Sequence, residues 1–177
     1  MLYTYHFVAL KDGSAETAAA FTTYTAGVAR AEARKDSGEI WGLFLPQLGF
    51  ASHERALLFR WQSTPHDVLS ACPLIGSSSV DRLSATARPA DTDQIKPGGI
   101  IVHRWFTIAP ADKDEVVALS KAAWVEFEND FETQIFGLFA AEPKAEDGAS
   151  IRILLVTRYG GHADWEMSRR PSVASAA

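Results

Sequence analysis

The residues best suited to chemistry lie on two segments in which polar and apolar residues alternate, 2–10 and 100–108. Side chains on such a strand point to its two faces in turn, so Arg104 shares a face with Phe106, and His103 lies on the other. A guanidinium inside a pocket would bind a carboxylate, phenolate or enolate oxygen through charge-assisted hydrogen bonds. The alternative is that Arg104 pairs with a carboxylate of the chain itself.

Four histidines are candidates for catalysis or cofactor binding. His6 and His103 could act as general bases, because an imidazole titrates near neutral pH, although both could equally be half-buried strand residues. His66 and His162 lie 96 residues apart (162 − 66), each close to an aspartate, so either could bind a haem iron while the carboxylate orients its other nitrogen. The alternative is that these polar residues begin helices. No other cofactor and no metal site are predicted, since the sequence has no His-Glu-x-x-His motif and a single cysteine.

Aromatic and arginine side chains gather on the predicted strands. Arg60 and Arg158 each end a strand and are followed by a ring, Trp61 or Tyr159. A ring-lined cavity suits a planar apolar ligand, whereas the alternative is ordinary core packing, with the arginine stems lying along the strand ends. The candidate catalytic residues are therefore Arg104, His6 and His103, and the candidate substrate-binding residues are Tyr5, Phe7, Trp41, Arg60, Trp105, Phe106, Phe136, Arg158 and Tyr159.

Three short matches in the same order indicate an internal repeat. The clearest sets Ile-Trp-Gly-Leu-Phe against Ile-Phe-Gly-Leu-Phe, and the separations run from 95 (135 − 40) to 99 (104 − 5) residues. Apolar strands often resemble one another, but three ordered matches at similar spacing are hard to obtain by chance. Segments 5–7, 40–44 and 55–61 match segments 104–106, 135–139 and 152–159.

The predicted elements of the first copy follow the order β-α-β-β-α-β, which ends with a short helix to about residue 71 and a strand at 80–88. This order describes a ferredoxin-like unit, an antiparallel sheet with both helices on one face. Two fused units would enclose a cavity between their sheets. We therefore predict an α+β chain of tandem ferredoxin-like repeats, at 1–89 and 100–177 with a linker at 90–99, closing into an intramolecular barrel.

The second copy is predicted to be incomplete at its C-terminus, because the residues after Arg170 have neither the length nor the pattern of a final strand. The missing strand would leave an open sheet edge, through which the chain could form a homo-oligomer.

Composition narrows the class of partner and the compartment. A net charge of −5 without a basic run argues against nucleic acid and anionic membranes, which leaves a small-molecule or protein partner. The single Cys72 cannot form an intramolecular disulfide, so we predict a cytoplasmic protein. Residues 1–10 lack the pattern of a signal peptide, and no apolar run approaches the roughly 20 residues of a membrane helix.

Three segments resemble NIPSNAP-like proteins of the dimeric α/β-barrel superfamily: Arg-Trp-Phe-Thr-Ile at 104–108, Ile-Phe-Gly at 135–137, and Arg-Tyr followed by Trp-Glu-Met-Ser-Arg within 158–169. The resemblance covers nearly the whole chain as two copies, and it implies a barrel with a pocket inside each unit or between them. By analogy with the Arg-x-Tyr opening of the family, it also implies that Arg104 lies in the pocket and that Tyr5 is its counterpart in the first copy.

The resemblance leaves three functions open, because the superfamily includes enzymes of several kinds. The first is a cofactor-independent oxygenase, cyclase or isomerase acting on an aromatic or polyketide-like substrate. The second is a non-catalytic ligand-binding protein of the NIPSNAP type. The third is a haem-dependent enzyme that uses His66 or His162. A cavity smaller than about 300 Å³ would favour the binding protein over the enzyme.

Overall fold

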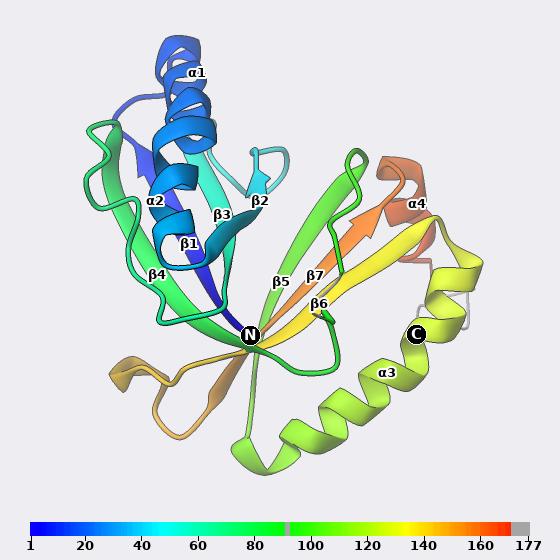
Figure 1. The fold of residues 1–177 in the computed structure, drawn as a ribbon. Helices are drawn as coiled ribbons and strands as arrows, with labels where there is room; N and C mark the ends of the chain where they lie inside the picture. Colours follow the sequence, from blue (N-terminus) through cyan, green and yellow to red (C-terminus); the bar gives the residue numbers. More distant parts are fainter. Residues whose placement is uncertain (91–92, 171–177) are drawn as a thin grey trace. The chain divides into compact units, whose positions relative to one another are not determined.

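The computed structural model describes residues 1–90 and 93–170, and the chain forms two compact units, Met1–Leu83 and Ser84–Ala177 (Figure 1). Each unit combines an antiparallel sheet with helices, so the predicted α+β class is confirmed. Two residues of the predicted linker, Asp91 and Thr92, and the tail 171–177 lie outside the described residues. None of the helices in the described ranges is long and apolar enough to cross a bilayer.

The four strands of the first unit lie in the order β2-β3-β1-β4, which is the strand order of a ferredoxin-like unit. The helical layer begins where the Ser14 hydroxyl accepts a hydrogen bond from the Thr17 N–H at 3.1 Å, an N-cap that satisfies one of the free donors of the first turn. The elements are β1 (Leu2–Leu10), α1 (Ala15–Tyr24), a π-helical stretch (Thr25–Ala29), α2 (Arg30–Lys35), β2 (Gly38–Phe44), β3 (Glu54–Trp61) and β4 (Ile75–Ala85).

The segment between β3 and β4 forms turns in place of the predicted short helix. The Asp67 carboxylate accepts a hydrogen bond from the Leu69 N–H at 3.0 Å. A bond of this kind occurs both in turns and at helix starts, so the predicted helix start at Asp67 is a turn in the structure.

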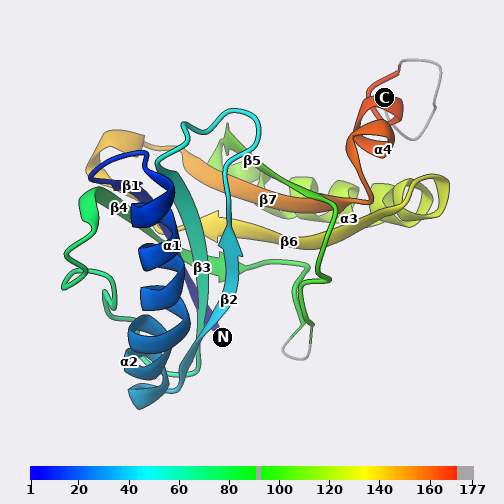
Figure 2. The same ribbon diagram turned by 90° about the horizontal axis from the view of Figure 1, so that it is seen from above.

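The core of the first unit lies between the helices and one face of its sheet, as Figure 2 shows for α1 and α2 beside β3. Trp61 is fully buried there and occupies space that only a glycine leaves free, because a Cβ on Gly38 would lie 2.4 Å from the Trp61 ring. The other core residues include Val8, Leu10, Phe21, Ala29, Ala33, Leu57 and Phe59.

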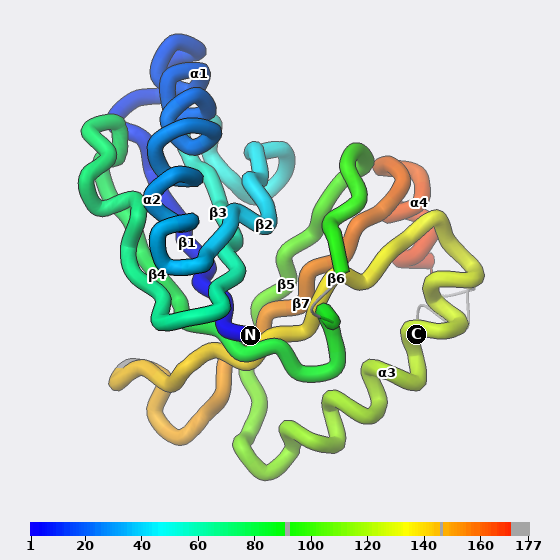
Figure 3. The backbone as a smooth tube through the Cα atoms, in the orientation of Figure 1, coloured from blue at the N-terminus to red at the C-terminus, as the bar shows by residue number. Residues whose placement is uncertain are grey.

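The second unit has the strand order β6-β7-β5, and its path can be followed in Figure 3. Within the described residues, β5 lies at the end of the strand order, so the fourth strand of a ferredoxin-like unit is missing beside it. A turn at Pro110–Asp112 leads into the long helix, as the sequence predicts for a proline at a helix start. The elements are β5 (Ile100–Ile108), α3 (Lys113–Asp130), β6 (Thr133–Ala141), β7 (Ile151–Tyr159) and α4 (His162–Met167).

An ion pair attaches α3 to β6 of the second unit. Both Nη atoms of Arg88 donate to the Glu128 carboxylate, at 2.7 and 3.0 Å, and the Ile135 N–H donates to the same carboxylate at 2.7 Å. The Arg88 guanidinium also lies over the Trp124 ring, 5.2 Å from its centroid. Trp124 is thereby fixed against β6, where it forms part of the site described below.

The two units share a pairing register. Leu2 lies opposite Trp61 in the first sheet and Ile100 lies opposite Tyr159 in the second. Further along the same strands, His6 faces Leu57 and Arg104 faces Leu155, so His6 and Arg104 occupy corresponding places. The pairing of Tyr5 with Arg104 is therefore wrong by one residue, and a one-residue slip in a strand moves a side chain to the opposite face.

Candidate functional site

The second unit contains a pocket of about 190 Å³ between α3 and the sheet. The pocket lies on the helix-covered face of the sheet. The predicted barrel places a cavity on the opposite face, between two sheets, whereas the resemblance also allows a pocket inside one unit. The last helix, α4, is only six residues long, so α3 provides most of the cover on this face. The lining comes from β5 (Val102, Arg104), α3 (Ala123, Trp124, Phe127), β6 (Ile135), β7 (Leu155, Thr157, Tyr159) and the residues after α4 (Ser168, Arg169).

Three rings give the pocket an aromatic wall. Trp124 and Tyr159 are buried, and Phe127 meets Tyr159 edge to face with ring centroids 6.1 Å apart. Trp124 and Phe127 also pack into the apolar core of the unit, so their positions are fixed by packing. A flat apolar ring inserted among these side chains would find edge and face contacts.

Two guanidinium groups give the pocket its charge. Arg104 is exposed, but the partial burial of its guanidinium lowers its pKa; the positive charge of Arg169 lowers it further, and Tyr159 acts in the opposite direction. Arginine nevertheless stays protonated in proteins. Within residues 1–90 and 93–170, the Arg104 guanidinium makes no hydrogen bond or ion pair. Because no carboxylate lines the pocket, the pocket is positively charged.

Among the predicted site residues of the second unit, the structure brings together Arg104 and Tyr159. Phe106 packs in the core beside the pocket, and Phe136 is buried outside the lining. His103 and Trp105 lie on the other face of β5, where the Arg152 guanidinium is 5.2 Å from the Trp105 ring. Burial lowers the pKa of His103 to about 4, so this imidazole is neutral near pH 7.

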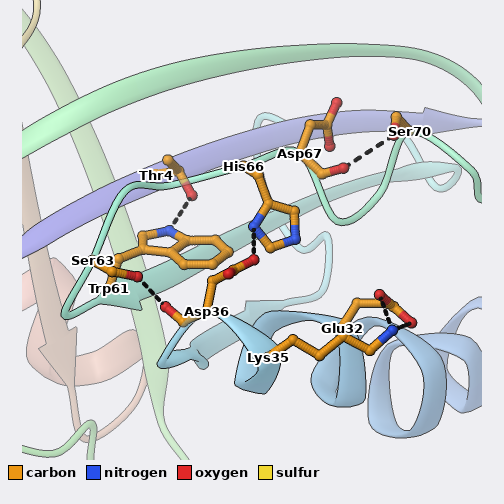
Figure 4. A network of polar contacts seen from close by, with 9 residues as sticks. All are labelled: Thr4, Glu32, Lys35, Asp36, Trp61, Ser63, His66, Asp67 and Ser70. Carbon is orange, nitrogen blue, oxygen red and sulfur yellow. Dashed lines mark hydrogen bonds and ion pairs between the residues drawn. The ribbon is translucent and has the colours of Figure 1, made fainter.

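The corresponding place in the first unit holds a buried polar network. The Trp61 Nε1–H donates to the Thr4 hydroxyl at 3.0 Å, and His6 Nε2 lies 3.0 Å from the same hydroxyl (Figure 4 shows Thr4, Trp61 and Asp67). The hydroxyl has a second lone pair as well as its own proton, so it can accept from Nε2 or donate to it, depending on the His6 tautomer, and Nδ1 lies 3.8 Å from the Asp67 carboxylate. Burial lowers the pKa of His6 to about 4, and the Asp67 carboxylate opposes this.

The two candidate haem ligands lie in different surroundings. The Nδ1 atom of His66 is 3.0 Å from the Asp36 carboxylate, and its ring centroid is 5.1 Å from that of Trp61 (Figure 4). His162 is exposed and begins α4. Neither histidine lines the pocket, and in the described part of the chain no three His, Cys, Asp or Glu residues gather as metal ligands would.

The remaining predicted residues lie outside the pocket. Arg60 is paired with Glu39, and Arg158 lies 3.6 Å from Glu132, so both arginines make ion pairs at strand ends. Tyr5 and Trp41 are buried, and Phe7 contacts Phe50 at 5.2 Å between ring centroids.

Sequence reasoning missed Thr157, Trp124 and Arg169 as pocket residues. The apolar periodicity of 116–131 predicted the helix but not its buried face, because Leu119 of the predicted stripe is 63% exposed and Trp124, outside the stripe, is buried. The segment of the resemblance at 165–169 contained Arg169, but it could not show that this residue meets α3.

No family model matches the sequence, and no curated protein does. Two solved structures resemble the fold. A "putative monooxygenase" from Lactobacillus acidophilus NCFM aligns over 99% of this chain and 83% of its own, with 7% identity and a TM-score of 0.54. An anthrone oxidase-like protein aligns over 99% of this chain and 81% of its own, with 13% identity and a TM-score of 0.58. At these identities the likeness shows the fold alone.

Proposed function

We propose that this chain is a small-molecule-binding protein whose second unit binds a compact aromatic anion between α3 and β7. The proposal rests on Arg104, a guanidinium without a hydrogen bond or ion pair among the described residues, in a pocket walled by aromatic rings. Arg169 adds a second positive charge at the same pocket. An anionic ligand would relieve the repulsion between these two groups, and its ring would occupy the apolar wall.

The volume of the pocket limits the ligand to about one ring. An apolar cavity of about 150 Å³ is enough for benzene, and the pocket measures about 190 Å³. Pockets for larger ligands begin near 300 Å³. The size therefore supports a single ring with a small acidic group. It fits the aromatic half of the predicted substrate class, argues against a larger polyketide-like substrate, and favours binding over the predicted enzyme.

The charge of the ligand is tested by a titration with benzoate and with benzyl alcohol, a neutral ring of similar size. The Arg104→Gln variant should bind benzoate at least about tenfold more weakly, because a hydrogen bond to a charged group is lost, and benzyl alcohol with unchanged affinity. Affinities can be measured by NMR titration of backbone amides. Arg82→Gln is the matched control, because it makes the same charge change at an exposed site in the first unit. Equal benzoate affinity in Arg104→Gln and the wild type would exclude the proposal.

A second candidate is cofactor-independent oxygen chemistry on the bound anion, as the comparison with a monooxygenase and an anthrone oxidase-like protein suggests. The pocket lining has no imidazole or carboxylate to act as a base. Its two guanidinium groups would instead favour a phenolate over the phenol, and a phenolate gives up electrons to O₂ more readily. A benzene-1,4-diol would pass two electrons and two protons to O₂, giving a quinone and hydrogen peroxide.

Oxygen uptake with benzene-1,4-diol tests this second candidate. The wild type should consume oxygen faster than buffer alone, and Arg104→Gln should match the buffer rate, because the phenolate is no longer stabilised. If the wild type binds benzoate but does not exceed the buffer rate, the oxygen chemistry is excluded and the binding function stands.

We also propose that the two units are divergent copies of one unit related to NIPSNAP-like proteins. The shared register supports this, as does a register shift before a glycine in both second strands, at Ile40/Gly42 and at Ile135/Gly137. Arg60 and Arg158 also correspond between the units, because they are separated by the same 98 residues as Leu2 and Ile100.

A further inference from the structure

We propose that Thr157 opens the pocket of the second unit and sets the size of the ring that the pocket admits. The inference rests on the proposed function for the use of the pocket. Its evidence is a comparison of the two units, position by position, on the face of each sheet that the helices cover.

Thr157 lies at the centre of the pocket floor. It is paired with Val102 on β5 and with Ile135 on β6, and all three residues line the pocket. Thr157 itself is buried, with 4% of its surface exposed, so its side chain is packed between these neighbours and does not reach into solvent.

The same place in the first unit is held by Phe59. Phe59 is paired with Thr4 on β1 and with Ile40 on β2, as Thr157 is paired with Val102 and Ile135. Counted from the Leu2–Trp61 and Ile100–Tyr159 pairs, the two residues stand at the same register position.

The Phe59 ring fills the first unit at this point. It is fully buried in the core beneath the helices, it stacks on Trp61 with centroids 5.8 Å apart, and it meets the His6 ring at 5.0 Å. A threonine at the same position of the second unit lacks that ring, and a core with a smaller side chain retains part of the lost volume as a cavity.

The contrast assigns separate roles to two residues that differ between the units. Arg104, at the place of His6, supplies the charge that selects an anion, whereas Thr157, at the place of Phe59, supplies the space for the ring. The size of the ligand and its charge should therefore respond to different substitutions.

Neutral rings test the size effect without involving the charge. We expect the wild type to bind benzene more tightly than naphthalene, Thr157→Phe to lose at least about tenfold in benzene affinity, and Thr157→Ala to raise the affinity for naphthalene relative to benzene about tenfold. Thr157→Val has nearly the wild-type shape and should leave both affinities within about threefold. The affinities are measured by NMR titration, with circular dichroism confirming the fold of each variant.

The inference is overturned if the wild type binds no benzene, or if Thr157→Phe binds it as the wild type does. Should Thr157→Phe fail to fold, Thr157→Ala decides: an unchanged ratio of naphthalene to benzene affinity rejects the inference, and a raised ratio supports it. A different outcome would separate this inference from the proposed function. If the Thr157 variants change benzene and naphthalene affinity as expected, but the wild type does not prefer benzoate to benzyl alcohol, the proposed anion is rejected and the role of Thr157 is retained.

Discussion

Replacing Trp61 with alanine should lower the free energy of unfolding of the first unit by about 3–5 kcal/mol. Trp61 is fully buried, stacks on Phe59 and donates its indole N–H to Thr4 at 3.0 Å. The space it occupies is shaped by Gly38, whose missing Cβ admits the ring. Because domains are stable by only about 5–15 kcal/mol, this single change should remove a large share of the stability.

Two further variants separate the causes of this loss. Trp61→Phe keeps an aromatic ring but removes the hydrogen bond to Thr4, so it should cost less than Trp61→Ala, with about 1 kcal/mol of the cost coming from the hydrogen bond. Leu48→Ala removes a side chain that is 71% exposed and should change the stability by less than about 0.5 kcal/mol. Urea unfolding followed by circular dichroism gives all three values. A loss below about 1 kcal/mol in Trp61→Ala would show that this ring does not hold the core together.

The strands and their order could be predicted because alternation and apolar periodicity are local signals. The alternating pattern of 2–10 and 100–108 predicts β1 and β5, and the spacing of Val116, Leu119, Ala123 and Phe127 predicts α3. The segment after Trp61 misled this reading, because its proline and aspartate suit both a helix start and a turn. The structure has turns at 68–71, where the Cys72 N–H donates to the Leu69 carbonyl three residues before it.

The pocket could not be located because its position depends on contacts between distant segments. A match of aromatic residues set Tyr5 against Arg104, whereas the strand register sets His6 there, and one residue decides which face a side chain occupies. The face itself depends on how much of the sheet the helices cover, and therefore on the shortness of α4. His66 and His162 show the same limit: their spacing suggests equal roles, and both are exposed, but the structure places His66 against Asp36 and His162 at the start of α4.

Acid should destabilise the first unit through His6. Burial lowers the pKa of this imidazole from 6.5 to about 4 in the folded chain. Between these values the unfolded chain binds the proton and the folded chain does not, so the contribution to stability is complete above pH 6.5 and is lost as the pH falls toward 4. The shift corresponds to a loss of about 3 kcal/mol. Urea unfolding at a series of pH values from 7 to 4 measures it.

The His6→Gln variant isolates this effect from other titrating groups, including His103, whose pKa is also lowered by burial. Its stability should change much less between pH 7 and 4 than that of the wild type, and the difference between the two slopes belongs to His6. Asp67→Asn should make the stability fall more between pH 7 and 4 than it does in the wild type, because the Asp67 carboxylate, 3.8 Å from Nδ1, favours the protonated imidazole. Without it the pKa of His6 should fall further, and NMR titration of the ring would show this directly. Equal pH slopes in the wild type and His6→Gln would mean that water reaches His6 in the folded chain, against the burial on which the argument depends.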